Sequence, residues 1–216
     1  MQERLVLQAV ERDDPGALFA LVRAEPRLRQ ARGPDGVSAL LHALYRRRMH
    51  LVELLRHDQL DGFEAAALGD VERLMSLLFR DDMVPLLVNG DGYTALHLAA
   101  FFNQPGTARL LIATGADIDA RAENETRQRP LHAAVVAGSV GIVTQLLYMG
   151  AYPDLQQKGG WTPLHLAAAY NRIEIAELLL QHDASIDIRD EAGDTPAALA
   201  ARRGHAELLA RLIAER

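Results

Sequence analysis

The sequence contains no cysteine. This absence excludes a disulfide framework and any metal site built from thiolates. A chain without disulfides suits a reducing compartment, and we interpret this one as cytoplasmic.

Several other features are also missing. No apolar run approaches the roughly 20 residues of a membrane span, and the N-terminus lacks the basic start and long apolar stretch of a secretory signal. The net charge of −6 and pI of about 5.7 argue against nucleic acid or an anionic membrane as the main partner. No HExxH, GxSxG or phosphate-loop motif occurs. We therefore expect no catalysis, no cofactor and no bound metal.

What the chain does contain is a recurring string, seen most clearly as GGWTPLHLAAAY at residues 159–170. Aligning its relatives on one central alanine gives successive intervals of 34, 22, 34, 35, 33 and 33 residues. Self-similarity at such a period indicates a stacked repeat array. A small residue is required where helices approach to about 8–10 Å. The aligned alanines are Ala9, Ala43, Ala65, Ala99, Ala134, Ala167 and Ala200.

Each repeat is predicted to form two short helices. Thr162 and Pro163 are typical of a helix N-cap and first helical residue. Four residues beyond the central alanine, five of the seven units have Gly or Asn, which tolerate the left-handed conformation that ends a helix. Paired leucines such as Leu178-Leu179 mark the second helices. Between units, turns such as Asp91-Gly92 predict short hairpins, which we call fingers.

The pattern D-x-x-G-x-T-P-L-H-x-A-A, followed after about ten residues by L-L-x-x-G-A-x-I-D-A, resembles that of ankyrin repeats. The resemblance is strong over 89–204 and weaker over 1–88. It implies an all-α solenoid of helix-turn-helix units with short β-hairpin fingers, whose concave surface of fingers and first helices binds other proteins. We expect one array over 1–216, with two divergent repeats in 1–61 and five repeats in 62–216, the last a C-terminal cap. Its final helix has a polar stripe at Glu207, Arg211 and Glu215.

Three histidines, His97, His132 and His165, occupy the same position in successive repeats. A shared metal ion would need all of them within about 2.1 Å, whereas equivalent positions of packed helices lie about 10 Å apart. We expect each ring instead to bond the backbone of the adjoining finger.

Two units depart from the regular spacing. The interval of 22 residues leaves no room for a finger near 56–62, so we expect a gap in the row of fingers. It is either a decayed repeat with a short loop or a bend that shapes the groove. The finger at 121–129 has about two extra residues, and is either a mobile insertion or a loop that contacts a partner.

The candidate binding surface combines aromatic and charged residues. Tyr93 and Trp161 are expected on finger tips, whereas Phe101, Phe102 and Tyr170 are expected at the exposed ends of first helices, where Phe101 is the one expected to be partly buried. Large rings on a concave surface are typical of interface hot spots. The alternative is that the rings pack against the next finger. The charged members are Glu125, Arg127 and Asp194.

These features predict a non-catalytic, monomeric scaffold that binds a protein partner of unknown identity through its concave groove, with a regulatory or inhibitory effect. Two alternatives stay open. The chain is a purely structural or self-associating module, or, less favoured, a hydrolase that uses groove carboxylates and histidines.

Overall fold

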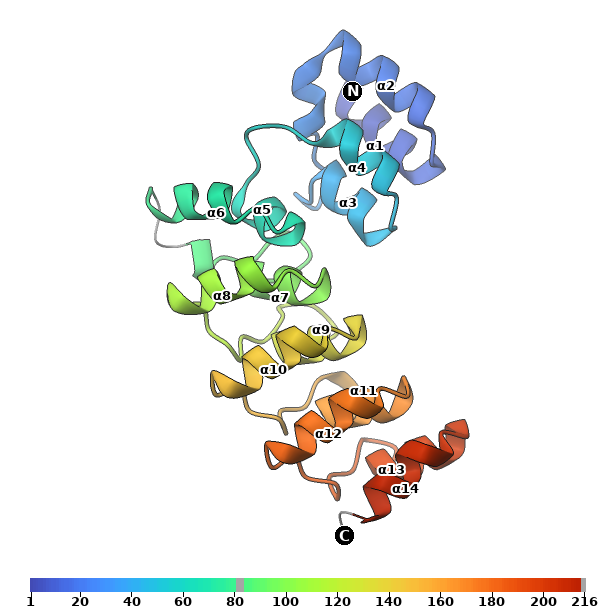
Figure 1. Cartoon of the computed structure of the whole chain (residues 1–216). Coiled ribbons are helices and arrows are strands. Elements are labelled where there is room, and N and C mark those ends of the chain that lie inside the picture. The colour runs from blue at the N-terminus through green and yellow to red at the C-terminus, as the bar shows by residue number, and fades with distance from the viewer. Residues whose placement is uncertain (81–83, 215–216) are drawn as a thin grey trace.

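The computed structural model describes residues 1–80 and 84–214, so Glu215 lies outside the described residues. The described chain forms fourteen α-helices, arranged as seven stacked pairs with the two termini at opposite ends (Figure 1). This confirms an all-α repeat solenoid. The pairs are α1 (Gln2–Arg12) and α2 (Pro15–Ala24), α3 (Ala39–Tyr45) and α4 (Met49–Leu55), α5 (Gly62–Leu68) and α6 (Val71–Leu78), α7 (Ala95–Phe101) and α8 (Pro105–Ala113), α9 (Pro130–Ala137) and α10 (Val140–Tyr148), α11 (Pro163–Ala169) and α12 (Ile173–Gln181), and α13 (Pro196–Arg203) and α14 (Ala206–Ala214). Short 3₁₀ turns cover Pro26–Gln30, Val84–Leu86 and Lys158–Gly160.

The helices begin largely where the sequence predicts. The hydroxyl of Thr162 accepts a hydrogen bond from the backbone N–H of His165, with Pro163 as the first helical residue of α11. Asp70 caps α6 in the same way. Ser139 is an exception, because its buried hydroxyl makes no hydrogen bond at the start of α10. Ser139 therefore provides no side-chain cap for that helix.

The first helices end in a left-handed residue in every unit. These residues all lie four positions beyond the central alanine, where positive φ is easiest for Gly and Asn. Asp13 and Arg47 adopt the same conformation, with φ of 58° and 56°. The full set is Asp13, Arg47, Gly69, Asn103, Gly138, Asn171 and Gly204.

The central alanines form the contact line between neighbouring first helices. Six of the seven are fully buried and Ala9 is 4% exposed. Their small side chains let α7 pack on α9 and α11 on α13. Leucines of the second helices, such as Leu111, Leu146 and Leu179, complete one continuous core.

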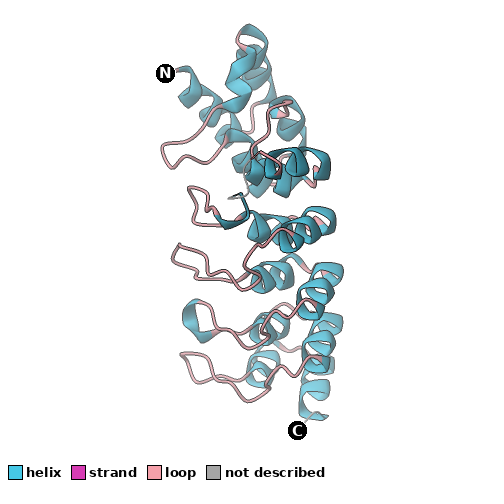
Figure 2. Ribbon diagram, turned by 90° about the vertical axis from the view of Figure 1, so that its left-hand side faces the viewer, coloured by secondary structure: helices cyan, strands magenta, loops and turns pink. Residues whose placement is uncertain are grey.

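Five fingers precede first helices, at 31–38, 87–94, 121–129, 155–162 and 188–195 (Figure 2). In the part of the chain that the structure describes, they contain two isolated β-bridges and no strand. In four of them a backbone N–H donates to the carbonyl four residues further along the chain, as the Asn89 N–H does to the Tyr93 carbonyl at 2.9 Å. A longer ladder of strand hydrogen bonds does not form there, because the chain reaches Thr94, the N-cap of α7, directly after the turn. The fingers are hairpin-shaped turns rather than β-hairpins.

Neighbouring fingers are joined by further backbone bonds. Glu123 N–H donates to the Gly92 carbonyl at 2.8 Å, and Lys158 N–H donates to the Thr126 carbonyl at 2.9 Å. The finger at 121–129 closes from Ala122 to Gln128, which is two residues wider than the others. Because this finger is bonded to the fingers on both sides, its extra residues form part of the row.

Residues 56–61 connect α4 directly to α5 without a finger. The expected gap in the row of fingers is nevertheless wrong. Gly90 of the finger at 87–94 lies so close to the finger at 31–38 that a Cβ atom would come within 1.7 Å of the Asp35 carbonyl oxygen. With no finger between them, the fingers on either side close directly onto each other.

We predict that Ala167→Leu lowers the free energy of unfolding by about 1–3 kcal/mol, because the larger side chain overpacks the contact between first helices. Urea denaturation measures the change. Ala113→Leu, at an exposed position of α8, is the matched control and should change stability by less than about 0.5 kcal/mol. An unaltered Ala167→Leu protein would contradict the alignment of the repeats.

We propose that the array divides at residues 56–61 into parts 1–61 and 62–216. α3 packs on α5 far less extensively than α5 packs on α7. In a solenoid, stability is approximately a sum of unit and interface terms, so the weakest interface opens first. Hydrogen–deuterium exchange should show α1–α4 losing amide protection before α7–α12. Loss of protection in all helices together would contradict this division.

Candidate functional site

The three repeated histidines link each first helix to the finger that follows it. The Nδ1 of His165 accepts the Thr162 N–H at 3.2 Å, and its Nε2 lies 3.1 Å from the Asp194 carbonyl oxygen. Nε2 therefore carries the proton, because a carbonyl only accepts. The same ring nitrogen of His97 bonds the Gln128 carbonyl at 3.0 Å, and that of His132 bonds the Trp161 carbonyl at 3.1 Å. Both ring nitrogens are engaged, which confirms the predicted bond to the finger backbone.

These histidines are uncharged at neutral pH. Removal from water disfavours the imidazolium form and lowers the pKa of His97 and of His132 to about 4. Burial lowers the pKa of His165 as well. The groove therefore receives no positive charge from these rings, and they are unsuited to accept a proton there.

A pocket of about 340 Å³ opens on the concave side, between the fingers and the first helices. Its walls come from the end of α3, from α7 and from the fingers at 87–94 and 121–129. The lining is mostly apolar, which is typical of a ligand-binding cavity. It consists of Tyr45, Asp91, Tyr93, His97, Leu98, Phe101, Asn124 and Gln128.

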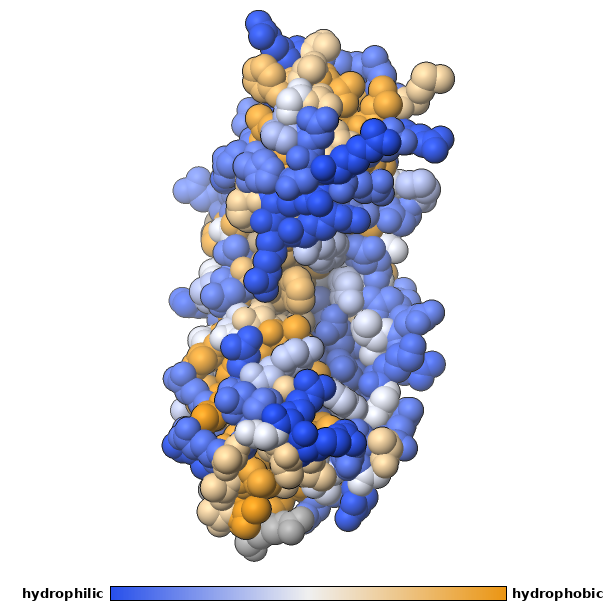
Figure 3. All heavy atoms as spheres, turned by 90° about the vertical axis from the view of Figure 1, so that its right-hand side faces the viewer, coloured by the Kyte–Doolittle hydropathy of each residue, from blue (hydrophilic) through white to orange (hydrophobic). Residues whose placement is uncertain are grey.

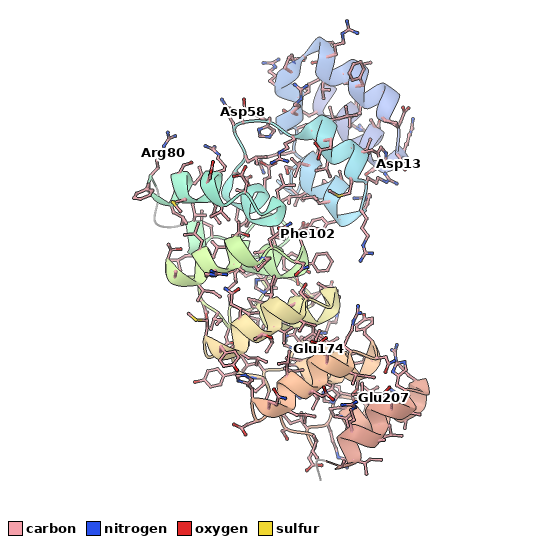
Figure 4. All side chains as sticks on the ribbon, in the orientation of Figure 1. Asp13, Asp58, Arg80, Phe102, Glu174 and Glu207 are labelled. Carbon is pink, nitrogen blue, oxygen red and sulfur yellow. The ribbon has the colours of Figure 1, made fainter. Side chains whose placement is uncertain are left out.

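Aromatic rings from two separated repeats meet at this pocket. The ring centroid of Tyr45, at the end of α3, lies 6.4 Å from that of Phe101 and 5.6 Å from that of Phe102. Phe101 and Phe102 lie edge to face at 5.1 Å. Phe102, labelled in Figure 4, caps the C-terminal end of α7. Tyr45 belongs to the second helix pair, whereas Phe101 and Phe102 belong to the fourth. The rings meet where the array lacks a finger between these pairs.

The structure brings only part of the predicted surface together. Tyr93 and Phe101 line the pocket, and Phe102 lies in an adjoining hollow with Met49 and Val136. Phe101 is 37% exposed, and Phe102, which is half-buried, is the more buried of the two. On the side of the molecule seen in Figure 3, hydrophobic residues form patches among hydrophilic ones.

Tyr93 and Trp161 are not at finger tips. Each follows the turn of its finger and is half-buried against the core, because its backbone carbonyl closes that turn. Trp161 is further fixed by the bond from His132. The alternative that the rings pack inward thus describes these two residues better than full exposure does.

The remaining predicted residues lie outside the pocket lining. Tyr170 is 50% exposed at the end of α11. Glu125 pairs with Lys158 at 3.1 Å, and Asp194 pairs with Arg202 at 2.6 Å. Arg127 is exposed and adopts φ of 52°, an uncommon conformation for a residue other than Gly.

Sequence reasoning missed Tyr45, although a signal for it exists. Tyr45 lies two residues after Ala43, and Phe101 lies two residues after Ala99, so both occupy the same repeat position. Its hydroxyl lies near the side chains of Asn89 and Asp91 but makes no well-formed hydrogen bond. Burial, aided by the Asp91 carboxylate, raises the pKa of Tyr45 above its usual value, so the hydroxyl keeps its proton.

Two further properties concern ligands and membranes. Within residues 1–80 and 84–214, no three His, Asp or Glu side chains gather as a metal-binding group. None of the helices in these ranges is long and apolar enough to cross a membrane.

Comparison with known proteins gives a family match over most of the chain. The family model described as ankyrin repeats (3 copies) matches residues 6–122, 63–157 and 131–216. Human Neurogenic locus notch homolog protein 2 is 31% identical over 127 residues, or 59% of this chain and 5% of that protein. Human Neurogenic locus notch homolog protein 4 is 36% identical over 116 residues, covering 54% and 5%. The chicken Nuclear factor NF-kappa-B p105 subunit is 34% identical over 89 residues, covering 40% and 9%. The chain thus spans less than a tenth of these relatives' lengths.

We predict that stability falls as the pH is lowered from about 7 to about 5. Between the unfolded pKa near 6.5 and the folded pKa near 4, the unfolded chain binds protons at His97 and His132 that the folded chain does not. Each histidine lowers the free energy of unfolding by up to about 1.4 kcal/mol per pH unit in that window.

Urea denaturation across this range tests the effect with His132→Gln. This variant should be less stable at neutral pH by about 1–3 kcal/mol, because a flexible amide replaces the ring that bonds both the Arg129 N–H and the Trp161 carbonyl, and its pH dependence should be shallower. Gln181→Ala, at an exposed position whose side chain does not titrate, is the control and should keep the slope of the parent protein. A His132→Gln slope equal to that of the parent would count against the buried neutral ring.

Proposed function

The chain belongs to the ankyrin-repeat family, and from this premise we propose that it is a non-catalytic module that binds one protein partner through its concave surface. Ankyrin repeats generally mediate protein–protein interaction. The observation that carries the proposal is the aromatic pocket between the fingers and α7, because it offers a partially exposed apolar anchor site on the concave side.

The organisation of the surface supports one continuous interface. Backbone bonds between neighbouring fingers fix the row from 87–94 to 188–195. Tyr170 extends the exposed aromatic surface beyond the pocket, toward the C-terminal repeats. A surface that is already ordered loses little conformational entropy when a partner binds, so more of the contact energy appears as affinity.

A binding role agrees better with the histidines than a hydrolytic one does. A general base must be free to take a proton, whereas His97, His132 and His165 use both ring nitrogens for backbone bonds. We propose that the effect of binding is regulatory or inhibitory and that the chain acts as a cytoplasmic monomer without nucleic-acid or membrane contacts. Sedimentation over a range of protein concentrations distinguishes a monomer from a self-associating module.

We predict that Tyr93→Ala with Phe101→Ala weakens partner capture at least tenfold, since loss of a hot-spot residue costs about 2 kcal/mol or more. The immobilised chain is used to capture proteins from a lysate of its source organism, and mass spectrometry identifies those bound. The affinity of the purified candidate is then measured for the parent and for the variant.

The matched control replaces two exposed residues of the second helix α10, Tyr148→Ala with Met149→Ala, and should leave the affinity unchanged. Circular dichroism verifies that both double variants fold. If the Tyr93 and Phe101 variant binds as tightly as the parent, the concave pocket is not the binding site.

A further inference from the structure

We propose that the pocket receives an arginine side chain of the protein partner. This inference rests on the proposed function and specifies the chemistry of the anchoring residue. It is argued from the charge of the pocket, the arrangement of its rings, its size and the rigidity of its finger.

The pocket has one charged group in its lining, the carboxylate of Asp91. His97, the other ionisable group that could carry charge near neutral pH, is neutral for the reason given above. No Arg, Lys or His forms an ion pair with Asp91 within the described ranges, whereas Asp194 and Glu125 on later fingers each have a cationic partner. A cation supplied by a partner would complete the pocket at Asp91.

The walls around Asp91 are built from aromatic rings. The ring centroids of Tyr45 and Phe101 lie 6.4 Å apart in an edge-to-face arrangement, and those of Tyr93 and His97 lie 5.6 Å apart with tilted planes. A cation over such ring faces is stabilised by the ring quadrupole. A guanidinium group is planar and weakly hydrated, so it stacks on rings and binds a carboxylate at the same time, which an ammonium group does less well.

The size and polarity of the pocket agree with one side chain. The Tyr45 hydroxyl is buried beside the side chains of Asn89 and Asp91, so the Asp91 carboxylate is the charged acceptor of the pocket. The volume of about 340 Å³ lies at the small end of the range of about 300–1,000 Å³ for ligand pockets. An extended side chain with an apolar stem and a charged end matches a mostly apolar cavity with one carboxylate.

The finger holds Asp91 in place before any partner arrives. Its N–H donates to the Asn89 side-chain oxygen at 3.2 Å, and its carbonyl accepts from the Asn124 side-chain nitrogen at 2.7 Å. The Tyr93 N–H donates to the same Asn89 oxygen at 2.9 Å. The loop that carries the carboxylate is thus held by Asn89 of its own finger and by Asn124 of the next finger. This order reduces the entropy lost on binding.

The test is a titration of the isotope-labelled chain with N-acetyl-L-arginine amide, followed by NMR. The amide signals of Asp91, Tyr93, His97 and Phe101 should shift with the added compound. N-acetyl-L-citrulline amide has the same shape without the charge, and should bind about tenfold more weakly, given the loss of the carboxylate and ring interactions. N-acetyl-L-lysine amide should also bind more weakly than the arginine compound.

Asp91→Asn should reduce the arginine affinity to that of citrulline on the parent chain. Glu174→Gln removes the same charge from an exposed position of α12, labelled in Figure 4, and should bind arginine as the parent does. The NMR spectrum of each variant reports whether it folds. If Asp91→Asn does not fold, the comparison of arginine with citrulline on the parent chain decides the question alone.

Equal binding of arginine and citrulline, or shifts confined to residues outside the pocket, would overturn the proposal. Equal binding of lysine would overturn the assignment to arginine. These outcomes differ from failure of the proposed function. That function fails when the Tyr93 and Phe101 variant keeps its partner, whereas the present inference fails when the pocket does not discriminate a guanidinium group from its neutral isostere.

Discussion

The close approach of neighbouring first helices is the constraint on which the rest of the structure depends. A line of buried alanines sets the separation of the helix pairs. At that separation, the Nε2 of a histidine in one unit reaches a carbonyl in the finger of the next unit, at 3.0–3.1 Å in three successive cases. The fingers are thereby fixed relative to the helices, and the concave surface they form with the first helices becomes a rigid surface for binding.

The same regularity explains why a local omission has a large effect. Where residues 56–61 replace a finger, the finger at 31–38 closes onto the finger at 87–94, and Gly90 permits the contact because it has no side chain. Tyr45 then meets Phe101 and Phe102. The pocket is a consequence of this closure, because its lining combines residues from both sides of the omitted finger.

The electrostatics of the concave surface follow from burial. The histidines are held neutral by removal from water, and two acidic groups on the later fingers, Glu125 and Asp194, are paired with Lys158 and Arg202. Asp91 differs from these two, since it has no cationic partner within the described residues. Its place in a pocket lined by aromatic rings distinguishes it from those two positions.

The sequence by itself determined the repeat, the helix pairs, the buried alanines and the structural use of the histidines, because these depend on periodicity and on contacts between equivalent positions of adjacent units. It located Tyr93 and Phe101 through the same reasoning, but it placed Tyr93 and Trp161 too far out, since the turn that precedes each ring directs it back toward the core. The closed row of fingers, the meeting of Tyr45 with Phe101 and the lack of a cationic partner for Asp91 among the described residues were decided only by the tertiary structure. These features arise from contacts across the irregular joint at residues 56–61, where residues two repeats apart become neighbours. The repeat spacing cannot predict such contacts, because it relates only equivalent positions of adjacent units.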